Sequence, residues 1–194
     1  MDAIQLFLQR HGVIHDYYIE GMWEFVPGEL MRQRPHPKVN SIAWILWHMT
    51  RGEDAGMNRF ITDRSQVLDD GGWMERMNVP LRHNGSGMSL DEVDELSQRI
   101  DLGALRGYSG AVRDRTREVV KGLDLASLDE VMQEDRLRQI LFVEGLAPPN
   151  SASLLENYTG WSKGRCWMAF GLTHLYQHFG EIEVIAALLG LDMG

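Results

Sequence analysis

The sequence predicts an all-α protein, a four-helix bundle with additional short helices. Apolar residues recur at helical spacing in several long segments, and sustained period-two alternation, typical of strands, is absent. No Asn-Gly turn lies between apolar strands. A chain of 194 residues can bury a sizeable core, so we expect one domain over residues 1–194.

The first two predicted helices are the clearest. Apolar residues from about position 4 to position 25 fall on one side of a helix. Pro35 and Pro37 then interrupt the helical pattern. Asn40 or Ser41 can cap a second helix, which should run over about residues 41–61.

A long connection and a third bundle helix are predicted in the middle of the chain. Residues 63–87 are rich in Gly, Asp and Asn, which indicates an extended connection with a short helical turn. This connection could be a lid, but we favour a surface segment held down by Trp73 and Met77. The capping-box sequence "SLDE" from Ser89 begins a short helix, and a third bundle helix follows over about residues 102–123.

The remainder of the chain should again be helical. Residues 127–146 read as an irregular helical stretch. The longest helix lies within about residues 153–189, is broken or begins near "YTGWSKG", and is followed by Gly190 as a natural C-terminal stop.

Composition argues against several classes of partner. The net charge is −9 with a pI near 5.2, and the chain lacks a run of Lys and Arg, so nucleic acid is not an expected partner. Cys166 is the single cysteine and the first residues do not resemble a signal peptide, so we expect a cytoplasmic protein. The apolar stretches are too short to span a membrane. Apolar surface on paired helices is compatible with a homodimer.

Histidines at helical spacing are the chemically informative residues. His174 and His178 lie four positions apart on the inward side of an apolar helix, where burial should keep both imidazoles neutral and able to bind a metal ion. His48 lies at the edge of the inward stripe of the second helix, where Gly52 and Ala55 leave room. The residues alone leave open whether these are metal ligands or core histidines bonded to backbone carbonyls.

A second pair, His11 and His15, repeats the same spacing on the inward face of the first helix. These two side chains could line the same cavity, orient a metal ligand through a hydrogen bond, or replace one of the other three histidines. Periodicity does not decide between the sets.

A resemblance favours the first set. The stretches "NSIAWILWHMTRGED" and "THLYQHFGEIEVIAALLG" are similar to the two signature regions of the DinB/YfiT-like superfamily. This resemblance implies a four-helix bundle that holds a metal ion through one histidine of the second helix and two of a later helix. The matching positions are His48, His174 and His178. The family pattern after the last histidine is matched by Gly180, Glu181 and Ile182.

Other candidates have less specific roles. Glu181, one turn beyond His178, could be a fourth ligand, an acceptor that orients an imidazole, or a general base; a surface carboxylate is the plain alternative. Tyr18, Trp44 and Trp167 could wall a pocket, although aromatic residues at this spacing usually belong to the core. Glu53 is expected to pair with an arginine.

The functional expectation is a metal-dependent enzyme acting on a small molecule, with a divalent Zn, Ni or Fe ion between His48, His174 and His178. The resemblance implies a thiol-dependent transferase or isomerase, with a low-molecular-weight thiol as a cosubstrate; a hydrolase is a further option. One alternative is a non-catalytic small-molecule or metal-responsive binding protein of the same fold. Another is an interaction protein whose imidazoles bind backbone carbonyls.

Overall fold

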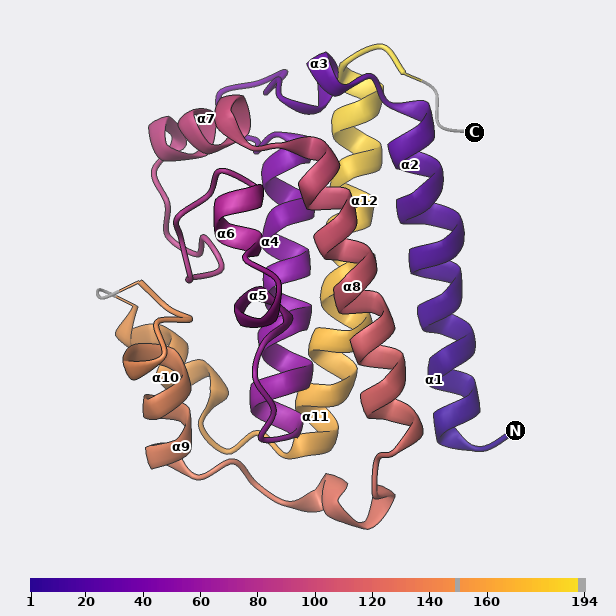
Figure 1. Cartoon of the computed structure of the whole chain (residues 1–194), viewed down its shortest axis with the longest axis vertical. Helices are drawn as coiled ribbons and strands as arrows, with labels where there is room; N and C mark the ends of the chain where they lie inside the picture. The colour runs from indigo at the N-terminus through magenta and orange to yellow at the C-terminus, as the bar shows by residue number, and fades with distance from the viewer. Residues whose placement is uncertain (149–150, 192–194) are drawn as a thin grey trace.

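Four long helical segments lie side by side in the computed structural model, within the residues that it describes, 1–148 and 151–191 (Figure 1). These described residues form no strand, and a single isolated β-bridge joins Val131 and Ser162. The protein is therefore all-α, as the sequence predicts.

The N-terminal segment is continuous from residue 3 to residue 25 and matches the predicted first helix. It comprises α1 (Ala3–Gly12), the π-helix η1 (Val13–Ile19) and α2 (Glu20–Phe25). Asp2 caps its start, because the Asp2 carboxylate accepts the backbone N–H of Gln5 at 2.8 Å. The π-helical turn was not predicted from the sequence.

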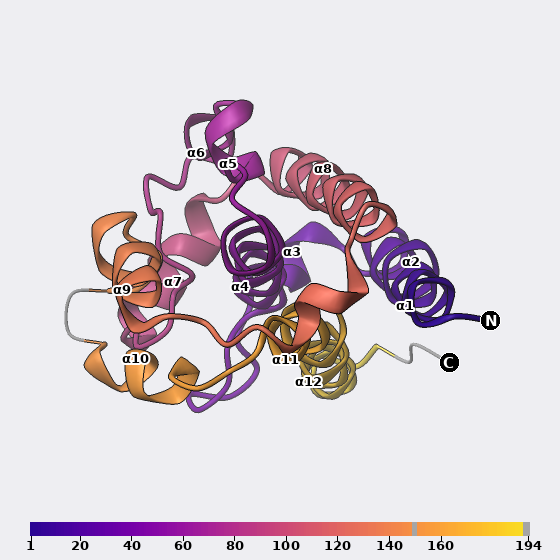
Figure 2. The same ribbon diagram turned by 90° about the horizontal axis from the view of Figure 1, so that it is seen from below.

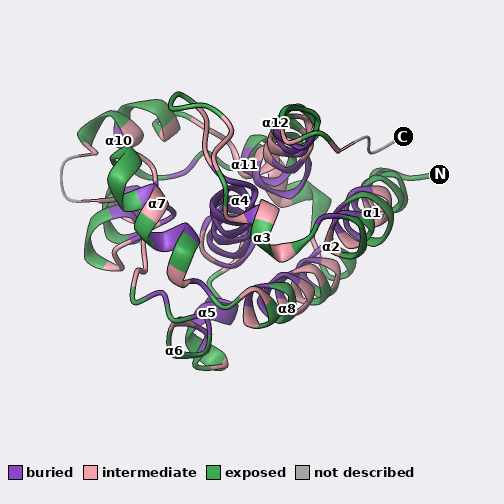
Figure 3. Ribbon diagram, turned by 90° about the horizontal axis from the view of Figure 1, so that it is seen from above, coloured by how far each residue is buried: buried purple, intermediate pink, exposed green. Residues whose placement is uncertain are grey.

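The second segment occupies the centre of the molecule. It consists of α4 (Ile42–Ala55) and the π-helix η2 (Gly56–Ile61), and the Ser41 hydroxyl caps it at the backbone N–H of Trp44. Every residue of α4 is buried, as the colouring of Figure 3 shows. A helix enclosed on all sides must pair its polar side chains within the protein, which explains why the polar clusters described below involve it.

The two remaining long segments flank α4. They are α8 (Leu102–Lys121) and the continuous run α11 (Lys163–Met168), η5 (Ala169–Thr173) and α12 (His174–Leu188). The end-on view of Figure 2 places α4 between α8 and α12, with α1 and α2 at the outer side. Gly190 has a φ of 82° just after α12, as expected for a residue that ends a helix.

Shorter helices complete the fold, several of them on the side of α4 that faces away from α1 (Figure 2). They are α3 (Gly28–Met31), α5 (Val67–Asp70), α6 (Trp73–Arg76), α7 (Leu90–Arg99), η3 (Leu125–Asp129), α9 (Glu134–Arg138), η4 (Gln139–Val143) and α10 (Ala152–Tyr158). In the described part of the chain, every helix falls short of the combination of length and apolar character that a bilayer span requires.

The connection between η2 and α7 is held against α4. Trp73 is 9% exposed and Met77 is fully buried, so these two side chains anchor the segment as predicted. The Asp54 carboxylate of α4 also accepts the backbone N–H groups of Val67 at 2.8 Å and of Leu68 at 3.0 Å. The segment is therefore a fixed part of the wall around α4.

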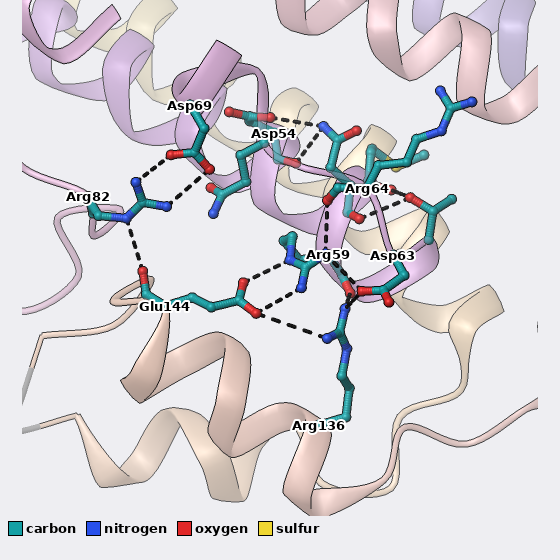
Figure 4. Close-up of polar contacts among 12 residues, drawn as sticks. Asp54, Arg59, Asp63, Arg64, Asp69, Arg82, Arg136 and Glu144 are labelled. Atoms are coloured by element: carbon teal, nitrogen blue, oxygen red, sulfur yellow. Dashed lines mark hydrogen bonds and ion pairs between the residues drawn. The ribbon is translucent and has the colours of Figure 1, made fainter. Parts of the chain in front are cut away.

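An ion-pair network attaches the region after α8 to this wall (Figure 4). Arg59 of η2 forms two hydrogen bonds of 2.8 Å with the carboxylate of Glu144. Arg82 donates to the Glu144 carbonyl at 3.1 Å, and Arg136 pairs with Asp63 at 2.7 Å. Bidentate Arg–carboxylate pairing fixes orientation, so this network sets the position of the chain around residue 144 relative to the 63–87 connection.

Candidate metal centre

Three imidazoles from α4 and α12 converge. The Nε2 atom of His174 lies 3.1 Å from Nε2 of His48 and 3.1 Å from Nε2 of His178. One nitrogen atom from each of the three rings lies within 4.8 Å of the other two. The packing of α12 against α4 brings together residues that are 126 positions apart in the sequence.

Local structure explains how the rings meet. His174 and His178 are one turn apart on α12, with ring centroids 4.4 Å apart and planes at 84°. The Trp44 ring stacks on His48 with centroids 4.8 Å apart and an interplanar angle of 6°. The π-helix η5 ends immediately before His174, and π-helical turns are frequent at functional sites.

Hydrogen bonds at the other ring nitrogens orient two of the imidazoles. Nδ1 of His48 lies 2.5 Å from the backbone carbonyl oxygen of Asn84, so His48 donates its Nδ1–H there. Nδ1 of His178 lies 3.0 Å from a carboxylate oxygen of Glu181 and donates in the same way. In the neutral ring, a hydrogen on Nδ1 leaves a lone pair on Nε2, which is the state of a metal-ligating histidine.

Burial keeps two of the three imidazoles, His48 and His174, uncharged. Burial lowers the pKa of His48 to about 4, although the hydrogen bond to the Asn84 carbonyl acts in the opposite direction and raises it. Burial also lowers the pKa of His174 to about 2, with smaller contributions from His48 and His178. These two imidazoles are therefore neutral near pH 7 and available as ligands.

The donor set fits a transition-metal ion. Because Nε2 of His48 and of His178 both carry lone pairs, the single Nε2–H available to His174 can satisfy only one of them. One of the two 3.1 Å contacts of His174 is then left without a hydrogen bond. Nitrogen ligands at about 2.0–2.1 Å from one ion are roughly 2.8–3.4 Å apart for angles between 90° and tetrahedral, so a cation resolves the conflict.

Gly52 provides the space that His174 occupies. A Cβ atom at position 52 would lie 2.9 Å from Cε1 and 3.1 Å from Nδ1 of His174. The small residue noted in the sequence therefore allows α12 to approach α4 at the imidazole cluster.

We expect Gly52→Ala to displace the His174 ring and to weaken metal binding by on the order of tenfold or more. The matched control is Gly21→Ala, because a Cβ at Gly21 meets nothing within 4 Å. Competition titration of Zn²⁺ against a chromophoric chelator measures the affinity. Equal affinities in both variants would contradict the assigned role of Gly52.

A groove lies next to the cluster. Its volume is about 520 Å³, and its walls come from α12 and from the segment that precedes α4. Glu181 belongs to this groove and also binds His178, so it connects the groove to the imidazoles. Lys38 and Gln177 add a positive charge and an amide to the lining.

The aromatic candidates lie at different distances from the imidazoles. Trp44 contacts His48 directly. Tyr18 packs on Phe179 with ring centroids 5.1 Å apart, beside the helical turn that carries His178. Trp167 stacks on Phe7 at 4.8 Å, in a different part of the core from the three histidines.

His11 and His15 form a separate cluster with Glu53. Nε2 of His11 lies 2.8 Å from one Glu53 carboxylate oxygen, and Nε2 of His15 lies 2.9 Å from the other. The expected arginine partner of Glu53 was therefore wrong, because α1 and η1 bring two imidazoles to this carboxylate instead. Burial raises the pKa of Glu53, but the charge and hydrogen bonds of His15 and His11 outweigh burial and hold the pKa below its usual range.

Sequence reasoning missed the backbone partner of His48. The Asn84 carbonyl carries no side-chain signal, and its position depends on Gly85, which has a φ of 87°. A Cβ at position 85 would lie 2.6 Å from the Trp47 ring, so the turn requires glycine for both reasons. The sequence "HNGSG" was the available signal for a special turn.

The fold and the three converging imidazoles define a helical protein with a candidate divalent-metal centre between two bundle helices. The sequence profile of the DinB superfamily matches residues 18–182. The chain therefore belongs to the DinB superfamily, which confirms the resemblance inferred from the two signature stretches.

A solved structure shows the same fold. It is described as the crystal structure of a conserved protein from Enterococcus faecalis, and it aligns with a TM-score of 0.68 at 14% sequence identity. The alignment covers 98% of this chain and 99% of that chain. No curated protein matches this sequence.

Proposed function

We propose that this protein is a metal-dependent enzyme that acts on a small molecule at the centre formed by His48, His174 and His178. The observation that carries the proposal is the approach of three Nε2 atoms, two pairs of them 3.1 Å apart, with two rings oriented by acceptors at Nδ1. Imidazole ligands suit Zn²⁺, Ni²⁺ and Fe²⁺, so the ligand type includes all three metals.

Such an ion, when bound by three protein ligands, supplies Lewis acidity at an open coordination position. The residues of the chain prepare that position. The Asn84 carbonyl holds His48, and Glu181 holds His178, so both rings keep the tautomer that presents Nε2. Glu181 is 45% exposed at its side chain, and we propose that it also accepts or returns a proton from a molecule in the groove.

The groove supports a small substrate. Its volume of about 520 Å³ suits a molecule of metabolite size, and Lys38 offers a charge that favours an anionic group. We propose a low-molecular-weight thiol as cosubstrate and a transferase or isomerase reaction, which is the chemistry that the family resemblance implies. Thiols are good ligands for the metals named above.

Elemental analysis of purified protein tests the metal centre. We expect His174→Ala to contain about one equivalent less transition metal per chain than the parent. His36→Ala is the matched control, because His36 is exposed and its Nδ1 accepts only the backbone N–H of Lys38 at 3.1 Å. Equal metal content in His174→Ala and the parent would refute the proposal.

Turnover separates the enzyme from a binding protein of the same fold. The parent is loaded with Zn²⁺, Ni²⁺ or Fe²⁺ and incubated with a panel of thiols and electrophilic small molecules. Product that forms with the parent and not with His174→Ala supports the enzyme. Tight metal binding without turnover favours the non-catalytic alternative.

A further inference from the structure

We propose that His11, His15 and Glu53 form a second metal site that holds the N-terminal helix against α4. The cluster lies between the first bundle segment and the central helix, apart from the imidazoles of α12. The proposal is independent of the function suggested above.

The three side chains present four donor atoms to one another. Nε2 of His11 faces Oε1 of Glu53 at 2.8 Å, and Nε2 of His15 faces Oε2 at 2.9 Å. The two rings are one helical turn apart, with centroids 4.4 Å apart. Each carboxylate oxygen therefore faces a different ring nitrogen, so Glu53 can offer both oxygens to an ion placed between the two rings.

The ligand set and its spacing match known metal chemistry. Two histidines and one glutamate bind Zn²⁺ in several enzymes, and two histidines with a carboxylate also bind Fe²⁺. Ligand atoms about 2.0–2.2 Å from one ion and at right angles to each other are roughly 2.8–3.1 Å apart. The two N–O separations in the cluster agree with that spacing.

Burial and charge favour a bound cation. The side chains of His11, His15 and Glu53 are 0%, 4% and 0% exposed. A buried carboxylate needs a compensating positive charge within the protein, which either a bound cation or a protonated imidazole of the cluster supplies. The cationic residues of α8 on this side, Arg113 and Arg117, are engaged by Asp16 at 3.6 and 2.7 Å.

The same burial defines the role of the site. Four protein donor atoms in a closed pocket leave no position for substrate, which is typical of a structural metal site. The site would join α1 and η1 to α4, in addition to their apolar contacts. His11 and His15 precede the span that the family profile matches, so the DinB match does not cover two of the three ligands.

The competing arrangement is a metal-free cluster in which both rings donate Nε2–H to Glu53. Counting bound Zn²⁺ distinguishes the two arrangements. After removal of metal and titration with Zn²⁺, the parent should bind about two equivalents per chain, and Glu53→Gln and His174→Ala about one each. Glu53→Gln keeps the side-chain volume but replaces one acceptor oxygen by an NH2 donor. The metal-free arrangement has no ion at this cluster, so it predicts the same Zn²⁺ stoichiometry for Glu53→Gln as for the parent.

Each result decides the proposal. His174→Ala that retains about one equivalent supports the buried site, even if Glu53→Gln fails to fold. A metal-free His174→Ala overturns it. If the parent binds one equivalent and only Glu53→Gln loses it, the buried site is supported and the centre formed by His48, His174 and His178 is refuted. Failure of the buried site and failure of the proposed function therefore give different results. Ion transfer to a chelator should also be slower from His174→Ala than from Glu53→Gln, because its remaining site is enclosed.

Discussion

Replacing Asp54 with alanine is expected to lower the free energy of unfolding by roughly 3–5 kcal/mol. Asp54 is fully buried in α4 and accepts hydrogen bonds from Arg51 at 3.1 Å and from the Tyr108 hydroxyl at 2.5 Å. It also accepts the backbone N–H groups of Val67 and Leu68. Its removal leaves the fully buried Arg51 guanidinium without its carboxylate partner, which is the costly kind of substitution in a protein interior.

Urea denaturation followed by circular dichroism measures this change. The matched control is Asp63→Ala, in the same region (Figure 4). Asp63 pairs with Arg59 and Arg136, but its side chain is 83% exposed, so little change is expected. Similar urea midpoints for Asp54→Ala and Asp63→Ala would show that burial does not determine how much Asp54 contributes to the free energy of unfolding.

The same substitution should weaken metal binding. Asp54 holds the start of α5, and Arg51 donates to the Arg82 carbonyl at 2.6 Å, two residues before Asn84. This chain of contacts fixes the carbonyl that orients His48. Loss of an interaction that orients a ligand typically lowers metal affinity by about 10–100-fold.

Helical periodicity was sufficient to predict the long elements. The expected helices at 4–25, 41–61 and 102–123 correspond to continuous helical runs at 3–25, 42–61 and 102–121. Each contains an apolar stripe long enough to define its inward face, and caps at Asp2, Ser41 and Asp101 define the starts. Local sequence carries this information because the helix period and its caps are local properties.

Contacts between helices were less predictable. A helical wheel places Trp167 on the same side as His174, but the π-helix η5 lies between them and changes the angular relation. Trp167 accordingly packs on Phe7. The spacing of His11 and His15 predicts which side of the first helix they lie on. It does not predict which residues of α4 lie opposite them, so Glu53 could not be recognised as their partner.

Helical periodicity did not show which histidine joins His174 and His178, and the family resemblance did. It selected His48 from among the histidines of the other helices, and the structure brings His48 together with His174 and His178. The two acceptors that orient the imidazoles are not equally predictable from the sequence. Glu181 could be found from its position one turn after His178, whereas the Asn84 carbonyl depends on the path of the whole 63–87 connection.

The metal-free protein should lose stability as the pH falls below about 6.5. Burial lowers the pKa of His48 from 6.5 to about 4 in the folded state. The unfolded chain therefore binds more protons than the folded chain in this interval, and acid favours unfolding. The contribution is fully present above pH 6.5 and is lost progressively as the pH falls toward the folded-state pKa; for His48 it amounts to about 3 kcal/mol.

Urea unfolding of the chelator-treated protein at several pH values between 7 and 4 measures this loss. Carboxylates also titrate near the lower end of that range, so the informative quantity is the difference between the parent and His48→Gln. The variant should lose less stability than the parent, whereas His36→Gln should follow the parent because His36 is exposed. His174, whose pKa burial lowers to about 2, continues to destabilise the folded state at still lower pH. Parallel curves for the parent and His48→Gln would mean that His48 is not held neutral by its burial between α4 and α12.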